Sequence, residues 1–264
     1  MCAKDFTLRE NLGITYYVCR AFESLPWLRH GFSTRRSGAD EEPLNLHPTV
    51  GYDPERAKKN RSRLLCALGL ENASLVSLNQ IHSNQVCAVE AINENYEGDA
   101  LVSNMENTAL AIKTADCFPV LIVDPVHRAV GAVHSGWRGT LARVLPRTIE
   151  EMCRRFQSDP ACLMSAMGPA IRECCFEVGE DVAQLFNEAY PGKSTTRPNA
   201  TSPGKHMANL AAVLKTQLTQ SGIPPGNQHD IGMCTCCNTR DFFSWRVEGA
   251  SAGRMMAVIA VWRR

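Results

Sequence analysis

Three short polar stretches follow apolar segments that we expect to form strands, and each stretch contains a side chain able to bind a metal ion. These side chains are His82, Cys117 and His134. The end of a strand holds a side chain in a fixed place because the sheet behind it is rigid. Two imidazoles and one thiolate with a vacant fourth position are typical of catalytic zinc. The residue types therefore predict a zinc site, while their wide spacing leaves a buried thiol and hydrogen-bonded loop histidines as the structural alternative.

The segment that begins at His134 also has the composition of an anion site. Its residues 135–140 join an expected strand to an expected helix and include two glycines, which permit a tight backbone turn. Free N–H groups at the start of a helix attract anions. We therefore expect Ser135, Gly136 and Arg138 to bind a phosphate or carboxylate. A simple helix cap with a solvated arginine is the alternative.

Two more polar side chains lie close to the predicted ligands in the sequence. Gln80 precedes His82 by two residues, and Asp116 is adjacent to Cys117. Residues beside metal ligands often orient those ligands or transfer protons. We expect Gln80 and Asp116 to act in this way, with a structural cap at the strand end as the alternative for Asp116.

Hydrophobic patterns and helix-start signals predict the elements that would position these residues. A helix begins with Asp53 as N-cap and Pro54 in its first turn, and it ends near Leu68. The other expected helices cover about residues 140–156, 180–189 and 207–221, and the expected strands cover 14–19, about 30–34, 74–78, 85–89, 109–114, 120–124, 129–134, 162–167 and 255–261. Strands between residues 74 and 134 look like hairpins without crossover helices, which favours a single α+β domain over residues 1–264, with mixed sheets flanked by helices. Residues 190–205 predict a long surface loop.

The composition is that of an ordinary globular chain and excludes several classes of function. The 264 residues include 28 basic and 27 acidic side chains, a net charge of +1, which argues against binding along a nucleic acid. Neither a GxGxxG nor a GxxxxGK[ST] motif occurs, so the two common nucleotide-binding loops are absent. The N-terminal residues contain no apolar signal segment, and the longest apolar run, residues 255–262, is too short to cross a bilayer. We therefore expect a cytoplasmic protein that binds neither nucleic acid nor membrane.

Twelve cysteines are the unusual feature of the composition. In a reducing compartment most of them would pack as small apolar side chains. One alternative is a structural zinc site for a binding partner, built from Cys234-x-x-Cys237 with Cys236 or from the pair Cys174-Cys175. A second CxxC or CxxH motif is missing and adjacent cysteines have the wrong spacing, so the role of Cys234-x-x-Cys237 stays open.

Motifs spread along nearly the whole chain resemble one known family. The three polar stretches read Asn79-Gln80-Ile81-His82, Thr114-Ala115-Asp116-Cys117 before Pro119-Val120, and His134-Ser135-Gly136-Trp137-Arg138-Gly139. Further matches are His30–Arg35, Leu44–Leu46, Asn60-Arg61, Gly168–Ile171, Phe176–Gly179, Cys234-Thr235, Phe243–Arg246 and Gly253-Arg254. Together they resemble the laccase-domain family, also called multicopper polyphenol oxidoreductase, whose members are often named purine nucleoside phosphorylases. The chain departs from the family pattern at Ser37-Gly38 and at His47, where glycines are usual.

The resemblance implies a single-domain α+β fold, similar to cysteine-hydrolase-like folds, that binds one zinc ion through His82, Cys117 and His134. It also implies activity on purine nucleosides: phosphorolysis of adenosine, inosine and methylthioadenosine, and deamination of adenosine. A bacterial branch is instead described as a peptidoglycan-editing hydrolase that removes a wrongly incorporated amino acid from a muramyl precursor. Arg35 matches a family position that lines the cleft, which makes it a candidate for substrate binding.

The residue types allow some of these chemistries and exclude others. A multicopper oxidase needs several copper centres with imidazole ligands, and seven histidines without a His-x-His pair cannot supply them. The usual nucleobase-deaminase signature, H-x-E with P-C-x-x-C, is also missing, so deamination would use a different zinc site. Phosphate held by Arg138 could displace a purine at the ribose carbon, and zinc-activated water could attack C6 of adenine or an amide. The expected partners are a nucleoside and phosphate, the physiological substrate stays open, and so does the choice between monomer and homodimer.

A metal-free enzyme is the other class that the residues leave open. Cys117 could be the nucleophile of a thiolate–imidazolium pair with His134, as the similarity to cysteine-hydrolase-like folds allows. Zinc that is lost on Cys117→Ala would favour the metal site, whereas a metal-free protein inactivated by alkylation of Cys117 would favour the pair.

Overall fold

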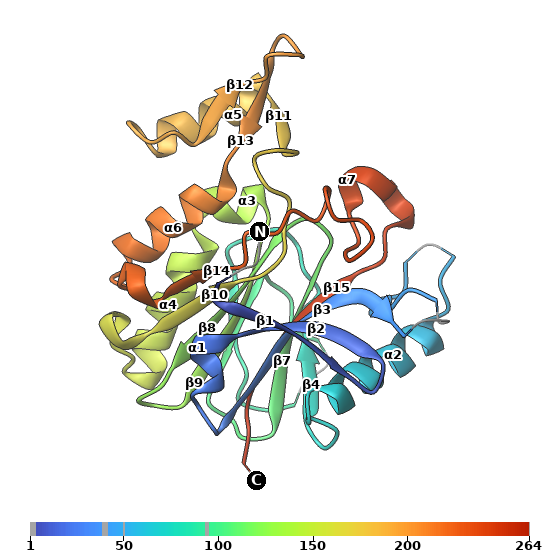
Figure 1. Ribbon diagram of the computed structural model, residues 1–264. Helices are drawn as coiled ribbons and strands as arrows, with labels where there is room; N and C mark the ends of the chain where they lie inside the picture. The colour runs from blue at the N-terminus through green and yellow to red at the C-terminus, as the bar shows by residue number, and fades with distance from the viewer. Residues whose placement is uncertain (1–3, 39–41, 50, 93–94, 264) are drawn as a thin grey trace.

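The computed structural model describes residues 4–38, 42–49, 51–92 and 95–263, and two six-stranded sheets packed against each other form the body of the molecule (Figure 1). The first sheet consists, in spatial order, of β1 (Phe6–Asn11), β2 (Ile14–Cys19), β3 (Leu28–Ser37), β15 (Met255–Val261), β7 (Thr108–Thr114) and β4 (Ser74–Ser77). The second consists of β14 (Gln228–Asp230), β10 (Met164–Met167), β8 (Phe118–Asp124), β9 (Ala129–Ser135), β6 (Ala100–Ser103) and β5 (Val86–Ala88).

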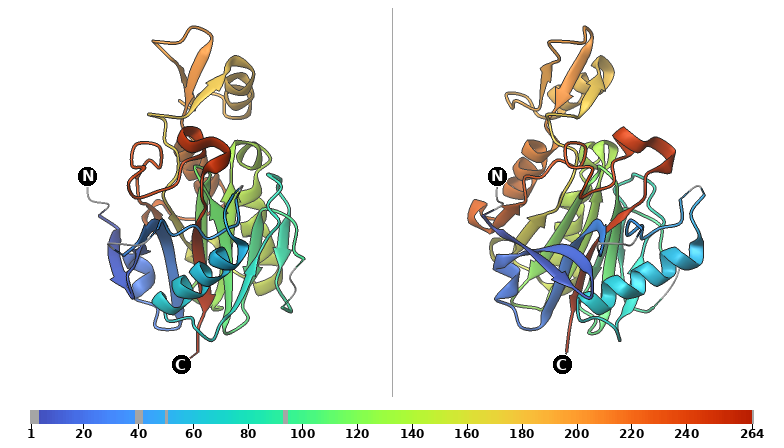
Figure 2. Two further views of the ribbon diagram at one scale, coloured as in Figure 1. Left: turned by 90° about the vertical axis from the view of Figure 1, so that its right-hand side faces the viewer. Right: turned by 45° about the vertical axis from the view of Figure 1, so that its right-hand side comes forward.

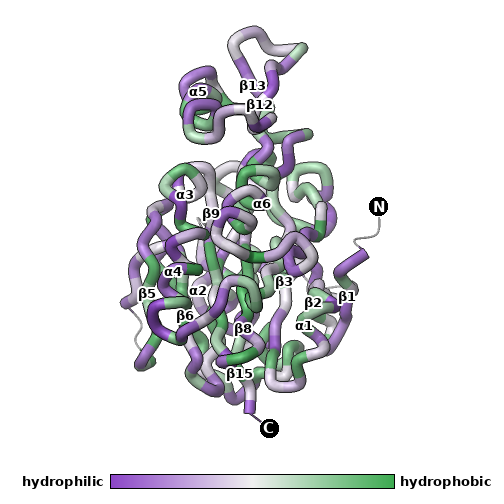
Figure 3. The backbone as a smooth tube through the Cα atoms, turned by 90° about the vertical axis from the view of Figure 1, so that its left-hand side faces the viewer, coloured by the Kyte–Doolittle hydropathy of each residue, from purple (hydrophilic) through white to green (hydrophobic). Residues whose placement is uncertain are grey.

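Helices cover the outer faces of the two sheets. The helix α2 (Pro54–Ala67) packs on the first sheet, whereas α4 (Val144–Phe156) and α6 (Leu210–Gln220) pack on the second. Central strands are therefore buried on both faces and read as continuous apolar runs, which are the hydrophobic stretches seen along the tube in Figure 3. In β15, Ala257 and Ile259 point between the sheets while Met256 and Val258 point toward α2, as the two-residue period of a strand requires.

The start of α2 is as the sequence predicts. The Asp53 carboxylate accepts a hydrogen bond from the N–H of Glu55 at 3.0 Å, and Pro54 occupies the first turn, where an N–H has no helical partner. One face of the helix is then tied to the preceding segment. Asn60 donates to the carbonyl of Asn45, and Arg61 donates to the carbonyl of Leu46.

A smaller lobe stands above the two sheets (Figure 2). It contains a three-stranded sheet in the order β11 (Glu177–Gly179), β13 (Lys205–Ala208), β12 (Thr196–Pro198), together with α5 (Glu180–Ala189). The predicted surface loop over residues 190–205 is wrong in part, because β12 forms inside it and pairs with β13. Short elements complete the chain: α1 (Arg20–Glu23), α3 (Trp137–Leu141), α7 (Trp245–Glu248) and the 3₁₀ turns η1 (Pro160–Cys162), η2 (Pro225–Asn227) and η3 (Gly249–Ser251).

Strand pairing differs from the sequence prediction. The hairpin of β8 and β9 is confirmed, but β4 pairs in parallel with β7, and β5 pairs in parallel with β6. Local pattern could not show this, because the chain passes from the first sheet to the second after β4 and returns at β7. The predicted helix over 140–156 is two helices, since Arg143 adopts a left-handed backbone with φ 64° between α3 and α4.

The mixed sheets and flanking helices nevertheless confirm the α+β class. The strands β1, β6, β11, β13 and β14 lie outside the predicted set, and all of these except β1 are runs of three or four residues. No helix in the described part of the chain combines the length and the apolar composition needed to cross a bilayer.

Candidate metal centre

Segments from both sheets bring His82, Cys117 and His134 together. One ligand atom of each lies within 4.8 Å of the others, and the two imidazole rings stand almost perpendicular with centroids 4.9 Å apart. The register of β8 and β9 pairs Pro119 with His134, which places Cys117 beside that histidine. His82 enters from the loop after β4 in a left-handed conformation, with φ 58°. The three predicted ligands thus form one group that can hold a metal ion.

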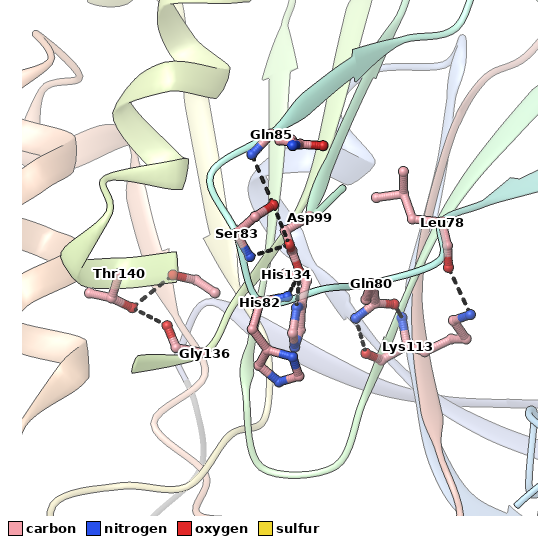
Figure 4. Close-up of polar contacts among 11 residues, drawn as sticks. Leu78, Gln80, His82, Ser83, Gln85, Asp99, Lys113, His134, Gly136 and Thr140 are labelled. Carbon is pink, nitrogen blue, oxygen red and sulfur yellow. Dashed lines mark hydrogen bonds and ion pairs between the residues drawn. The ribbon is translucent and has the colours of Figure 1, made fainter. Parts of the chain in front are cut away.

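A buried carboxylate fixes His134 from behind. Asp99, next to the start of β6, accepts a hydrogen bond from Nδ1 of His134 at 2.7 Å, and both side chains are buried (Figure 4). The other ring nitrogen of His134, Nε2, is thereby left as its ligand atom. The same carboxylate accepts hydrogen bonds from the backbone N–H of His82 at 3.1 Å and from the hydroxyl of Ser83 at 2.8 Å. One acidic residue therefore orients two of the three ligands.

The charges in this group favour a thiolate. Burial by itself would raise the pKa of the Cys117 thiol, but the charge of His134 and hydrogen bonds from both histidines outweigh burial and lower this pKa to about 6. Burial would also lower the pKa of His134, but the Cys117 thiolate and Asp99 raise it to about 9. Metal binding requires a deprotonated cysteine, and this surrounding supplies one near neutral pH.

Gly136 leaves the room that the ligands occupy. A Cβ at this position would lie 3.0 Å from Sγ of Cys117 and 3.1 Å from Cδ2 of His82. Both distances are shorter than ordinary van der Waals contact, so a larger residue would push the two ligands apart. The predicted role of Gly136 in substrate binding is untested, but its small size has this clear structural reason.

The two side chains predicted for acid–base work each have firm partners. The Gln80 amide spans the backbone of Lys113, donating to its carbonyl at 2.8 Å and accepting from its N–H at 2.9 Å (Figure 4). The Asp116 carboxylate accepts from the hydroxyl of Thr235 at 2.6 Å and from the backbone N–H of Arg246 at 2.7 Å. These contacts tie the loops around the ligands to one another.

The residues predicted for anion and substrate binding lie in three different settings. Arg138 is exposed, and its guanidinium stacks on Trp137 at 4.1 Å from the ring centroid. The Ser135 hydroxyl is buried and pairs with that of Thr140 at 2.8 Å. Arg35 forms an ion pair with Glu248 at 3.0 Å and also donates to a carbonyl in the segment before α7. Their roles toward a substrate stay predictions.

A cavity of about 610 Å³ opens directly over the ligands. Its lining includes all three of them. Its walls carry two further kinds of side chain, the aromatic residues Trp137, Phe176 and Trp245 and the cationic residues Lys113, Arg246 and Arg254.

Part of this lining forms a group of positive charges that the sequence interpretation missed. Burial lowers the pKa of Lys113, and the nearby charges of Arg61 and Arg254 lower it further. Burial likewise lowers the pKa of His47 to about 4, with Lys113 and Arg254 acting in the same direction. The Lys113 ammonium donates to the backbone carbonyl of Leu78, and the Arg254 guanidinium donates to that of Ala252. Burial lowers the pKa of Arg254, and the negative charges of Cys117 and Asp116 act in the opposite direction. Such a concentration of positive charge attracts an anion.

Asp99, which contacts two of the predicted ligands, is the other residue of the candidate site that the sequence interpretation missed. Its one local signal is an acidic side chain directly before an apolar strand of four residues. For Arg254 the signal was stronger, because Gly253-Arg254 is one of the motifs that resemble the family, although the sequence assigned it no role.

Comparison with known proteins places the chain in a family. Residues 29–262 match the family model described as multi-copper polyphenol oxidoreductase laccase. A protein of Deinococcus radiodurans named purine nucleoside phosphorylase is 37% identical over 239 residues, which cover 89% of this chain and 90% of that protein. A protein of an unknown prokaryotic organism named adenosine deaminase is 33% identical, covering 84% of this chain and 90% of that protein.

Solved structures agree with the sequence comparison. The crystal structure of YlmD from Geobacillus stearothermophilus superimposes with a TM-score of 0.86 and 27% identity, over 98% of this chain and 99% of that one. The crystal structure of YfiH from Bacillus licheniformis gives a TM-score of 0.85 and 26% identity, over 96% of this chain and 98% of that one. With the match of the family model over most of its length, the chain belongs to the multi-copper polyphenol oxidoreductase laccase family.

Proposed function

We propose that this protein is a zinc-dependent enzyme of purine nucleosides that cleaves them with phosphate and deaminates adenosine, with His82, Cys117 and His134 as the zinc ligands. The observation that carries the proposal is the convergence of these three donors, oriented by Asp99, at a cavity of about 610 Å³. The names of the relatives in Deinococcus radiodurans and in the unknown prokaryote support the substrate class.

The donor set fits zinc. Two imidazoles and a thiolate are the ligand types that zinc prefers, and three protein ligands leave a position for a reactant. A zinc ion held there supplies a Lewis acid that activates water or polarises a substrate oxygen. A multicopper centre does not fit, because three donors can serve one ion and the four-cysteine group elsewhere in the described residues has no imidazole.

The cavity walls suit a purine base and an anion. Trp137, Phe176 and Trp245 offer aromatic faces on which a flat heterocycle can stack. Lys113 and Arg254 offer partly buried positive charge for a phosphate oxygen. In phosphorolysis, a phosphate oxygen bonds to C1′ of the ribose as the bond from C1′ to the base breaks, and the base leaves with the electron pair and takes up a proton. Binding phosphate and ribose side by side is therefore the main task of these residues.

Asp99, Gln80 and Asp116 serve this chemistry by positioning. Asp99 holds the His134 ring, and the Gln80 amide fixes the backbone that carries Lys113. Asp116 holds the backbone of Arg246, a residue of the cavity wall. The contacts of Gln80 and Asp116 support a role for both in orienting neighbouring groups.

A metal-free cysteine hydrolase is the second candidate, and one observation favours it. The lowered pKa of Cys117 and the raised pKa of His134, with Asp99 behind the imidazole, also describe a thiolate–imidazolium pair with an orienting carboxylate. In that enzyme the Cys117 thiolate would attack the substrate, and bound zinc would inhibit it.

The test compares substrates and metal states of one preparation. The zinc-loaded protein is incubated with adenosine with and without phosphate, and separately with a muramyl-amino-acid precursor, while adenine, inosine and free amino acid are followed by chromatography. Phosphate-dependent adenine release or inosine formation supports the proposal. Release of the amino acid alone shows the peptidoglycan-editing activity instead. Activity that survives removal of zinc and is lost on alkylation of Cys117 would establish the metal-free pair.

A further inference from the structure

Four cysteines outside the candidate metal centre gather into a second cluster. Cys174, Cys175, Cys234 and Cys237 place their Sγ atoms within 4.8 Å of one another. Sγ of Cys237 lies 3.6 Å from that of Cys174 and 3.3 Å from that of Cys175. The sequence presented the two pairs as separate alternatives for a zinc site, whereas the fold brings them together from positions more than sixty residues apart.

The spacing of the four sulfur atoms fits a single tetrahedral ion. With a zinc–sulfur bond of roughly 2.3 Å, the edges of a tetrathiolate site are about 3.8 Å long. The observed separations lie around this value. A multi-iron cluster needs a wider ring of thiolates, because its own iron and sulfide atoms lie between them. A disulfide would use two of the thiols and leave the convergence of the other two without a purpose.

Backbone contacts hold the two cysteine-bearing segments, residues 170–176 and 234–246, in place around the cluster. Ala170 and Cys234 form a parallel bridge, and the N–H of Thr235 donates to the carbonyl of Ala170 at 3.1 Å. The N–H of Arg172 donates to Sγ of Cys234 at 3.5 Å, an interaction that stabilises a thiolate ligand. Cys234 is buried, while Cys174 and Cys237 are exposed, so an ion has a path from solvent to the buried ligand.

The cluster joins the two segments that form one wall of the cavity over His82, Cys117 and His134. Ile171 and Phe176 flank the first cysteine pair, and Trp245 and Arg246 follow the second, and all four line the cavity. Arg246 also connects the two segments directly, donating to the carbonyl of Cys175 at 3.1 Å. An ion bound by all four thiolates would cross-link these loops and fix the wall.

We propose that Cys174, Cys175, Cys234 and Cys237 bind a structural zinc ion, separate from the site of His82, Cys117 and His134. The proposal does not depend on the substrate of the enzyme. The ion replaces protons on four thiols, stays coordinated by protein alone and takes no part in the reaction. Its role is to hold the 170–176 and 234–246 segments together.

The first test is the zinc content of the full chain, purified under reductant and measured by elemental analysis. The wild type is expected to hold two zinc ions per chain, Cys237→Ser one, Cys117→Ala one, and the double variant none. Cys66→Ser, which changes an exposed thiol of α2, is the matched control and should keep two. A wild type with one zinc that disappears on Cys117→Ala and is unaffected by Cys237→Ser overturns the proposal. So does iron in place of zinc, or a disulfide within the cluster in protein prepared without air.

A second measurement tests the cluster without Cys237→Ser, so it stays informative if that variant fails to fold. The wild type is loaded with cobalt in place of zinc, and its near-ultraviolet thiolate-to-cobalt absorption is recorded. A cluster of four thiolates should add an absorption about four times that of the single Cys117 thiolate, and Cys117→Ala should keep most of it. A spectrum abolished by Cys117→Ala contradicts a second site. This readout also separates the two proposals, because it reports the cluster whether or not the protein acts on nucleosides.

Discussion

Asp99 holds His134 through a hydrogen bond of 2.7 Å between a carboxylate oxygen and Nδ1, and both side chains are buried. The pairing of β6 with β9 creates this contact, since Ala100 lies opposite Val133 in the antiparallel register. The same carboxylate receives the N–H of His82. The geometry of two of the three predicted metal ligands therefore depends on one residue that is not itself a predicted ligand.

Replacing Asp99 with Asn should weaken metal binding without removing a ligand. The amide keeps the shape of the side chain but loses the negative charge that orients the imidazole and raises its basicity. Loss of such a supporting carboxylate typically costs 10- to 100-fold in metal affinity. Competition with a chelator measures the change. Asp124→Asn is the matched control, because Asp124 makes a similar bond to His127 in the turn between β8 and β9. Equal affinity in the Asp99 variant and the wild type would show that the carboxylate is dispensable.

Gly136→Ala should disrupt the metal site while sparing the fold. The added methyl group would lie 3.0 Å from Sγ of Cys117 and must displace that ligand or His82. We expect a loss of at least tenfold in zinc affinity, measured by competition with a chelator, and a small change in melting temperature. Gly226→Ala serves as the control, because a Cβ there meets nothing within 4 Å. An alanine variant that binds zinc as tightly as the wild type would mean that the ligands do not pack as described.

Arg254→Met should raise the KM for phosphate more than Arg138→Met does. Arg254 lines the cavity, half-buried among other positive charges, whereas Arg138 is exposed and stacks on Trp137. A hydrogen bond to a charged group contributes about 1.5–3 kcal/mol, which corresponds to roughly a 10- to 100-fold increase in KM. Steady-state kinetics at varied phosphate measures both variants, and Arg254→Lys should restore part of the loss. The reverse ranking would return the anion site to the start of α3, where the sequence predicted it.

His30 should make the fold sensitive to acid. Its ring accepts a hydrogen bond from the N–H of Cys19 at 2.8 Å, and burial lowers its pKa to about 3. The unfolded chain binds this proton near pH 6.5, so the stability contributed by neutral His30 is complete above that pH and falls as the pH drops toward 3. Between these two pH values, protonation of His30 lowers the free energy of unfolding by about 1.4 kcal/mol per pH unit. The free energy of unfolding, measured in urea from pH 7 to 4.5, should decline less steeply with falling pH for His30→Gln than for the wild type. Parallel curves would contradict a buried neutral His30.

The sequence was sufficient to single out the three side chains that converge at the candidate metal centre and to predict the regular elements near them. His82, Cys117 and His134 are polar residues at the ends of apolar runs, a local pattern that can be recognised in the sequence without knowledge of the fold. The N-cap at Asp53 and the strands β2 and β15 were predicted for the same reason, because their signals lie within a few residues.

The parts that escaped prediction depend on pairing between distant segments. Asp99 meets His134 only because β6 pairs with β9, and the cysteine cluster forms only because Ala170 bridges to Cys234. The group of positive charges requires Lys113 and Arg254, which are far apart in the sequence, to converge on one cavity. A local pattern carries no information about such contacts, and the parallel pairing of β4 with β7 was missed for the same reason.

The most direct test of the account is to measure zinc content and phosphate-dependent adenine release on the same samples of wild type and Cys117→Ala. The account predicts that the variant holds one zinc ion fewer per chain than the wild type and releases no adenine above background. A variant that loses activity but keeps its full zinc content would contradict the metal centre and favour Cys117 as a nucleophile. A variant that keeps both zinc and activity would refute a role for Cys117 in the site.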